Sequence, residues 1–235
     1  MNNNFELNVF STIEDICLEA VNIFIELLNS GEKNNFIVLG GKTPHLFYHF
    51  LSQQVRSWLD ITLILSDERL VGVNTPESNF GMIKCKLLDH IKRKSGPKLI
   101  PVFNDFSKDQ SSRILEALNS STHSLLPPKA AFLGIGTDGH TASLFPGHEE
   151  SFFIEDPFFI LHRHNEPFQR LSVSMKILSE TPLLVFLVAG KVKKNILRQI
   201  VNEHCNNSHL PVQRLINKAQ GKVIILCDQD ADPNK

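Results

Sequence analysis

Apolar residues recur along the chain in two patterns, one typical of a helix and one typical of buried strands. From Thr12 to Asn29 they return at helical spacing and form a single face. Further along, short uninterrupted apolar runs occupy residues 36–39, 61–65, 130–135, 183–188 and 223–226. Segments that suit helices lie between these runs, at residues 46–54, 79–91, 108–119 and 192–203. The pattern predicts strands that alternate with helices.

A strand that is apolar on both faces is typical of the covered parallel sheets of α/β proteins. The alternation therefore predicts an α/β fold with a doubly wound, mainly parallel sheet and helices on both faces. Residues 152–175 differ, because aromatic residues there give way to strict alternation from Arg170 to Met175. We expect extra strands in this region, with an antiparallel edge as one arrangement. No repeat or linker divides the 235 residues, so we expect a single domain over residues 1–235.

The charge balance and the apolar stretches limit the classes of function. Lys plus Arg total 24 and Asp plus Glu total 25, a net charge of −1 that favours neither nucleic acid nor an anionic membrane as a partner. No apolar run approaches the roughly 18 residues of a membrane span, and the first residues lack the pattern of a secretory signal. The cysteines, at positions 17, 85, 205 and 227, lack the paired spacing of zinc or redox motifs. We therefore expect reduced thiols and a cytoplasmic protein.

Polar or glycine-rich segments follow four of the predicted strands. They are residues 40–44, 66–69, 136–140 and 190–193. Because the carboxyl ends of parallel strands share one edge of a sheet, where crevices bind ligands, we expect these segments to form one site.

The first of these segments combines two glycines with a predicted helix start. Thr43 followed by Pro44 suits a hydroxyl N-cap and a proline in the first turn. Free N–H groups at such an end attract an anion, and Gly40 and Gly41 allow close approach of the backbone. An ordinary capped helix after a tight turn is the alternative. The spacing matches neither a Walker A loop nor a dinucleotide-binding motif.

Three lysines follow Gly190 at the start of another predicted helix: Lys191, Lys193 and Lys194. Cations at this end of a helix are unfavourable by roughly 0.3–1 kcal/mol each, and a bound anion would offset the conflict. A phosphate contact is one interpretation. The alternative is that the side chains extend into water, and we expect this of two of the three.

Two arginines have the planar donor geometry that suits phosphate or carboxylate. Arg69 comes directly after a buried strand, beside Asp67 and Glu68, so a local ion pair is the alternative to ligand binding. Arg170 follows Pro167 by three positions and leaves the same two alternatives open.

His140 is the natural candidate for a general base, because an imidazole can accept a proton from water near neutral pH. Asp138 is close enough in sequence to orient it, and glycines stand on both sides of Asp138. The other histidines are weaker candidates for a functional role. His45 and His49 have the spacing of a metal pair but no third ligand nearby, so we expect no metal site. His162, Arg163 and His164 are expected to flank a strand.

The same motifs resemble the 6-phosphogluconolactonase family, which belongs to a superfamily shared with glucosamine-6-phosphate deaminase. The matching blocks are Gly-Gly-x-Thr-Pro at 40–44, Asp-Glu-Arg at 67–69 with Ser78 and Asn79, the Asp-Gly-His block at 138–146, Arg170, and Gly-x-x-Lys at 190–193. They occur in the order found in the family and span most of the chain.

The resemblance implies hydrolysis of 6-phosphoglucono-δ-lactone to 6-phosphogluconate in the oxidative pentose phosphate pathway. It implies His140 as the catalytic base, supported by Asp138, with no metal or cofactor. It implies substrate and phosphate binding by Gly40, Gly41, Thr43, Asp67, Arg69, Arg170 and Lys193. Functional coupling to glucose-6-phosphate dehydrogenase, the preceding enzyme, is a further expectation.

Two other functions are weaker matches. In the deaminases the Gly-His segment continues with a glutamate that residues 141–145 lack, and an aromatic residue stands where this chain has Arg69. A non-catalytic sugar-phosphate sensor on the same fold is the second alternative. Loss of Asp138, His140 or Arg69 would indicate such a sensor, and all three are present.

Overall fold

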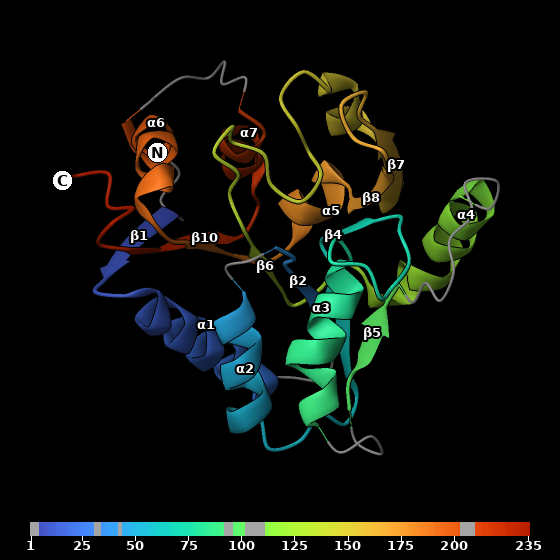
Figure 1. The fold of residues 1–235 in the computed structure, drawn as a ribbon, viewed down its shortest axis with the longest axis horizontal. Coiled ribbons are helices and arrows are strands. Elements are labelled where there is room, and N and C mark those ends of the chain that lie inside the picture. The colour runs from blue at the N-terminus through green and yellow to red at the C-terminus, as the bar shows by residue number, and fades with distance from the viewer. Residues whose placement is uncertain (1–4, 31–33, 42–43, 92–95, 102–110, 203–209) are drawn as a thin grey trace.

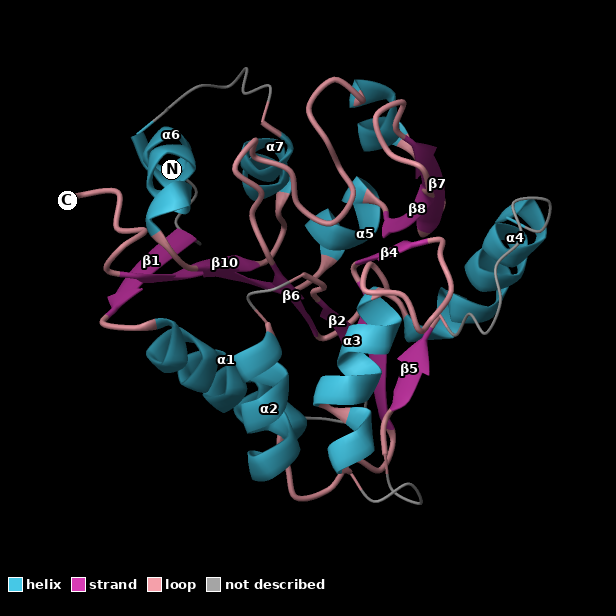
Figure 2. Cartoon of the chain, viewed as in Figure 1, coloured by secondary structure: helices cyan, strands magenta, loops and turns pink. Residues whose placement is uncertain are grey.

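A seven-stranded parallel sheet runs through the middle of the protein (Figures 1 and 2). The computed structural model describes residues 5–30, 34–41, 44–91, 96–101, 111–202 and 210–235. The strand order is β1-β10-β9-β6-β2-β3-β5, and each pair of neighbours is parallel. The strands are β1 (Phe5–Phe10), β2 (Asn34–Val38), β3 (Ile61–Leu65), β5 (Lys98–Ile100), β6 (Ala130–Leu133), β9 (Leu183–Val188) and β10 (Lys222–Asp228).

Helices cover both faces of this sheet, which confirms the predicted doubly wound α/β fold. The face drawn lower in Figure 1 carries α1 (Ile13–Leu28), α2 (His45–Gln54) and α3 (Asn79–Lys86). The other side carries α4 (Ser111–Thr122), α5 (Met175–Glu180), α6 (Lys194–Asn202) and α7 (Pro211–Lys218). Strand residues alternate between the two cores: Phe36 and Val38 pack with α1, whereas Ile37 packs on the opposite side. Burial on both faces explains the uninterrupted apolar runs.

The first helix shows how the sequence sets local structure. Thr12 and Asp15 form a capping box, in which the Thr12 hydroxyl accepts from the Asp15 N–H and the Asp15 carboxylate accepts from the Thr12 N–H, at 3.2 and 3.0 Å. The apolar face, with Cys17, Ala20 and Phe24 fully buried, packs on the sheet. The helix begins within one residue of its predicted start, because the capping box and the start of the apolar face lie at the same place in the sequence.

A second, smaller sheet contains the strands expected in residues 152–175. It has the order β4-β8-β7, with β4 (Asp67–Arg69), β7 (Phe158–His162) and β8 (Gln169–Val173), and it is antiparallel. Strand β8 pairs with β4 and β7 pairs with β8, so neither extends the edge of the large sheet. Ser66 joins the two sheets, since its N–H donates to Val38 at 2.8 Å and its carbonyl accepts from Val173 at 2.9 Å.

Some element boundaries differ from the sequence prediction. Helix α2 begins at His45 with Pro44 at the N-cap position, so Pro44 precedes the first turn, and Thr43 lies outside the described residues. The lysine segment begins with a 3₁₀ turn, Lys191–Lys193, before α6. Strands β1 and β5 and helices α5 and α7 left no recognised pattern in the sequence. None of the helices in the described part of the chain is long and apolar enough to cross a membrane.

Candidate active site

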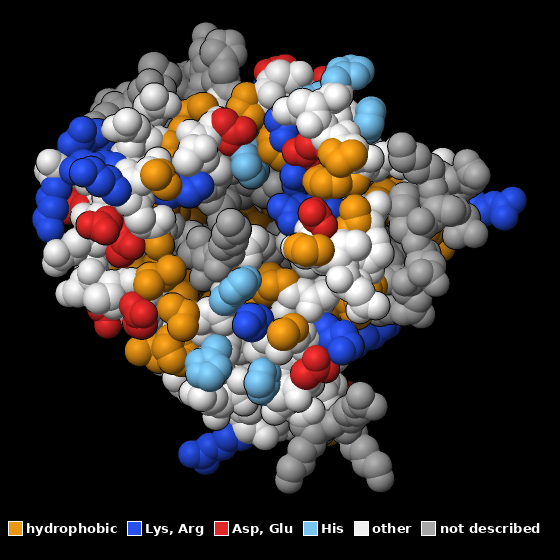
Figure 3. All heavy atoms as spheres, in the orientation of Figure 1, with side chains coloured by type: hydrophobic (Ala, Val, Ile, Leu, Met, Phe, Trp, Pro, Cys, Tyr) orange, Lys and Arg blue, Asp and Glu red, His pale blue; other side chains and the backbone are white. Residues whose placement is uncertain are grey.

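One cleft of about 420 Å³ lies where β2, β3, β6 and β9 end. Its walls include every predicted site residue that the structure describes, namely Gly40, Gly41, Asp67, Arg69, Asp138, His140, Arg170 and Lys193. Thr43 lies outside the described residues. Figure 3 shows this face of the molecule, with basic and histidine side chains gathered around the hollow at its centre. The expected meeting of the four segments is therefore confirmed, while the role of each residue stays a prediction.

A tight turn after β6 places His140 beside Asp138. The Gly136 N–H donates to the His140 carbonyl at 2.8 Å, and the Gly139 N–H donates to the Gly136 carbonyl at 3.1 Å. Gly139 has φ +83°, which disfavours residues with a side chain. A Cβ at Gly136 would overlap the His140 ring and crowd the Asp138 carboxylate, so the turn requires glycine at this position too.

The Asp138 carboxylate fixes which ring nitrogen of His140 is free. Asp138 Oδ1 lies 2.5 Å from Nδ1 and accepts the His140 N–H at 3.2 Å. Partial burial raises the pKa of Asp138, but the hydrogen bonds and charge of His140 outweigh it and bring this pKa to about 2. An ionised carboxylate can only accept, so in the neutral imidazole Nδ1 carries the proton and Nε2 carries the lone pair. That is the arrangement a general base needs.

The ring of Phe145 supports His140 from a second direction. The two ring centres lie 4.5 Å apart, and Phe145 is only 2% exposed. The guanidinium carbon of Arg163, from the turn between β7 and β8, lies 4.0 Å from the centre of the same ring. Both residues line the cleft.

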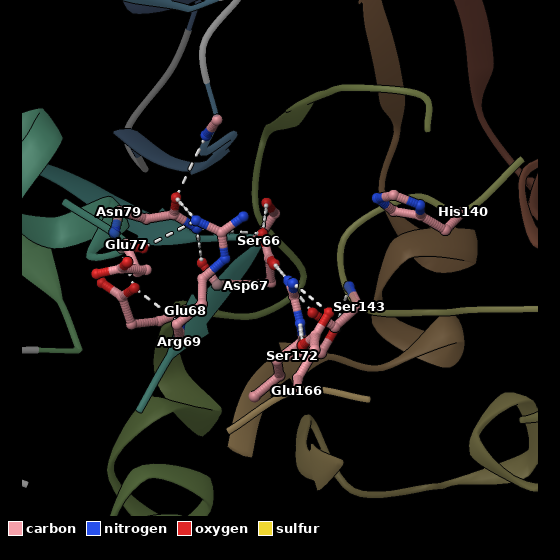
Figure 4. Close-up of polar contacts among 12 residues, drawn as sticks. Ser66, Asp67, Glu68, Arg69, Glu77, Asn79, His140, Ser143, Glu166 and Ser172 are labelled. Atoms are coloured by element: carbon pink, nitrogen blue, oxygen red, sulfur yellow. Dashed lines mark hydrogen bonds and ion pairs between the residues drawn. The ribbon is translucent and has the colours of Figure 1, made fainter. Parts of the chain in front are cut away.

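A second corner of the cleft is built around Asn79, the first residue of α3 (Figure 4). Its side-chain oxygen accepts from the Gly41 N–H and from Arg69 Nη1, both at 3.2 Å. Arg69 Nη1 also donates to the Glu77 carbonyl at 2.8 Å, and Arg69 Nε is buried with no hydrogen-bond partner among the described residues. A Cβ at Gly40 would overlap the Asn79 amide, which explains the glycine there. Among the described residues Arg69 forms no ion pair, so the local pairing considered above is not found.

The Glu68 carboxylate caps α3 and forms no ion pair with the Arg69 guanidinium. Its carboxylate accepts from the backbone N–H groups of Arg69, Asn79 and Phe80 at 2.6–2.8 Å, and from the Ser78 hydroxyl at 3.3 Å. Burial raises the pKa of Glu68 to about 7, and the backbone hydrogen bonds act in the opposite direction. This carboxylate connects β4 to α3 and so fixes the Arg69 corner.

Arg170 is held by two carboxylates. Its Nε and Nη2 donate to Glu166 at 2.6 and 3.0 Å, and its Nη1 lies 3.4 Å from Asp67. The residue is only 8% exposed. Of the two alternatives left open for Arg170, the structure therefore displays the ion pair. Asp67 is engaged as well, because Ser143 donates to it at 2.9 Å.

Lys193 is the member of the lysine segment that lines the cleft. Burial lowers its pKa, and the negative charge of Asp138 acts in the opposite direction. Lys191 is exposed and outside the cleft lining. The preceding Gly190, at φ +90°, donates its N–H to both carboxylate oxygens of Asp228 at 3.0 Å, which anchors the turn.

Several cleft residues were not candidates on sequence grounds: Asn79, Phe145, Arg163 and Glu166. Asn79 and Phe145 stand inside motifs, which is the signal that could have found them. No sequence signal marks Arg163 or Glu166, since the small sheet determines where these two residues lie. Within the described ranges no cluster of three or more His, Cys, Asp or Glu residues could hold a metal ion.

The fold and the cleft define an α/β protein with a cleft at the carboxyl edge of a parallel sheet, lined by a histidine paired with a carboxylate and by cationic side chains. Residues 11–225 match the family described as glucosamine-6-phosphate isomerases/6-phosphogluconolactonase. The chain belongs to this family.

Similar proteins cover nearly the whole chain. A 6-phosphogluconolactonase of Caulobacter vibrioides is 30% identical over 234 residues, covering 94% of this chain and 96% of the relative. One of Helicobacter pylori is 28% identical, covering 91% and 93%. The solved structure of 6-phosphogluconolactonase from Leishmania guyanensis has a TM-score of 0.83 at 21% identity, covering 96% and 97%. A monomeric glucosamine-6-phosphate deaminase has a TM-score of 0.79 at 20% identity, covering 96% and 98%, so the fold is common to both activities.

Proposed function

We propose that this protein is a 6-phosphogluconolactonase that hydrolyses 6-phosphoglucono-δ-lactone to 6-phosphogluconate in the oxidative pentose phosphate pathway. The observation that carries the proposal is the Asp138–His140 pair, whose free imidazole nitrogen belongs to the same cleft as Arg69 and Lys193. The names of the sequence relatives support the same activity. A base and a set of cations in one cleft suit a substrate that carries both an ester bond and a phosphate.

In the proposed reaction His140 Nε2 takes a proton from water, and the water oxygen attacks the lactone carbonyl carbon. The carbonyl π electrons move to the oxygen, which becomes an oxyanion. When that electron pair returns, the bond between the carbonyl carbon and the ring oxygen breaks. The ring oxygen takes the proton from the His140 imidazolium, and the carboxylic acid then ionises. A positioned base of this kind contributes typically 10²–10⁴-fold in rate.

We assign the phosphate to the cationic side of the cleft, with Arg69, Lys193, the Gly40–Gly41 turn and Thr43 as its binding residues. The unpartnered Arg69 Nε supports this assignment, because a buried donor without an acceptor is costly. Asp67 and Arg170 line the same cleft, where they hold its wall beside the substrate.

The mechanism uses protein side chains and water, with no metal ion or cofactor. We further propose that residues 1–235 act as one domain, since the cleft draws on segments from Leu39 to Lys193. A cytoplasmic location, without nucleic acid or membrane as a partner, fits the unpaired cysteines 17, 85 and 227. Functional coupling to glucose-6-phosphate dehydrogenase would follow from the shared lactone.

The test is lactone hydrolysis, with substrate generated from glucose 6-phosphate and the rate measured above a blank without enzyme. We expect a large excess for the wild type that His140→Ala abolishes with the fold intact. The matched control is His148→Ala, because His148 also lies two positions from a carboxylate partner, Glu150 at 3.3 Å, but outside the cleft lining. A wild-type rate equal to the blank contradicts the proposal. Ammonia release from glucosamine 6-phosphate would indicate the deaminase activity instead.

A further inference from the structure

The turn between β7 and β8 places a second arginine, Arg163, on the cleft wall. Its guanidinium lies 4.0 Å from the centre of the Phe145 ring, in the range of a cation–π contact. Its Nη1 donates to Glu166 at 2.7 Å. The side chain is thus held in one place by a ring on its face and a carboxylate at its edge.

The other two arginines of the cleft, Arg170 and Arg69, have different partners. Arg170 uses three of its nitrogens on Glu166 and Asp67. Arg69 belongs to the corner built by Asn79. Among the described residues Arg163 donates only through Nη1, and its side chain is 23% exposed, so its other donors remain for a ligand.

Phe145 links this guanidinium to His140, the proposed base, and all three residues line the cleft. The ring centre of His140 lies 4.5 Å from that of Phe145, so the imidazole and the Arg163 guanidinium contact the same ring. Because Phe145 is almost fully buried, the ring is a fixed support for both groups. Glu166 offsets only part of the charge of Arg163, since Arg170 binds the same carboxylate through two nitrogens.

We propose that Arg163 binds the carbonyl oxygen of the lactone and stabilises the negative charge that develops on it when water attacks. The inference rests on the proposed function, and it assigns to Arg163 the part of the substrate that the phosphate-binding residues leave. The same oxygen becomes a carboxylate oxygen of the product. Arg163 therefore contacts the product carboxylate as well, while Arg69 and Lys193 contact the phosphate.

The experiment compares Arg163→Met and Arg163→Lys with the wild type. Arg163→Met lowers kcat by about 100-fold with a smaller change in KM, as expected for loss of a donor to an oxyanion. Inhibition by 6-phosphogluconate weakens about ten-fold, whereas inhibition by inorganic phosphate does not change. Arg163→Lys keeps the positive charge and restores part of kcat. The matched control is Arg214→Met, since Arg214 lies 5.0 Å from the Phe153 ring and outside the cleft lining.

Two results overturn the inference. One is a kcat for Arg163→Met equal to that of the wild type; the other is an equal loss of inhibition by phosphate and by 6-phosphogluconate, which would place Arg163 at the phosphate. Failure of the proposed function is recognised separately, by a wild type that hydrolyses no lactone above the blank. Calorimetric titration of both variants with 6-phosphogluconate and with phosphate then still decides whether Arg163 binds the carboxylate. Thermal unfolding of each variant verifies that it is folded.

Discussion

The Ser143 hydroxyl donates a hydrogen bond of 2.9 Å to the Asp67 carboxylate, across 76 positions of the chain. Ser143 belongs to the segment that carries His140, and Asp67 begins β4. The same carboxylate lies 3.4 Å from Arg170 Nη1 on the paired strand β8. Asp67 therefore joins the three segments that form one wall of the cleft, and all three side chains are buried.

Replacement of Asp67 with Ala should destabilise the protein by about 3 kcal/mol, because it leaves a buried arginine without one of its partners. Urea unfolding followed by fluorescence or circular dichroism measures this loss. The control is Lys84→Ala, which breaks an exposed pair with Asp89 and should cost less than about 1 kcal/mol. Equal losses of stability in the two variants would contradict the inference that Asp67 holds the three segments of the cleft wall together.

Gly136→Ala should lower kcat strongly while the protein stays folded. The added methyl group would overlap the His140 ring, so the imidazole must move away from its place beside Asp138. Gly134→Ala is the matched control two positions earlier, since a Cβ there meets only the Leu39 side chain at 3.8 Å. Steady-state kinetics compares the two. If both alanines leave the same kcat, the close packing at Gly136 does not position the histidine.

Lys193→Ala should raise KM more than it lowers kcat, because the proposed contact of Lys193 is with the phosphate, away from the reacting carbon. Lys191→Ala should leave both constants near their wild-type values, since Lys191 is exposed. The decisive measurement is the ratio of the KM values, together with inhibition by inorganic phosphate. A KM for Lys193→Ala that matches the wild type would count against a phosphate contact.

The central strands could be predicted because they are buried on both faces. Strand β2, for example, sends Phe36 to one core and Ile37 to the other and so leaves a continuous apolar run. Strand β1 lies at the edge of the sheet, where its residues are half-buried or exposed, and no such run results. Strand β4 is three polar residues that form a strand because β8 pairs with them. No local pattern carries that information.

In the candidate site, too, local contacts could be predicted from the sequence, whereas contacts between distant segments could not. Asp138 and His140 are two positions apart, so their pairing follows from the turn between them. Arg170 and Asp67 are 103 positions apart, and the sequence alone could not decide between ion pair and ligand contact. Nothing around Arg163 distinguishes it from an ordinary residue at a strand end. Its contact with Phe145 depends on how the small sheet packs against the segment after β6.

The buried Glu68 gives the protein a testable dependence of stability on pH. Burial raises its pKa from 4.5 to about 7, so between these values the folded state holds a proton that the unfolded state releases. The contribution of this protonated carboxyl to the free energy of unfolding is fully present below about pH 4.5 and is lost as the pH rises through about 7. For this one group the loss in the free energy of unfolding amounts to about 3 kcal/mol at most.

Urea unfolding of the wild type and of Glu68→Gln, from pH 4.5 to pH 8, isolates this contribution. Glutamine does not titrate, so the variant should lack this fall, and the difference between the two curves should change with pH. Loss of hydrogen-bond acceptors to the N–H groups of α3 adds a cost that does not depend on pH, which is why the slope is the quantity to compare. Glu155→Gln is the control: Glu155 is exposed and its pKa lies below 4.5, because Lys176 lowers it. A difference curve that is flat for Glu68→Gln would mean that Glu68 is ionised across the whole range, held so by its hydrogen bonds to the start of α3.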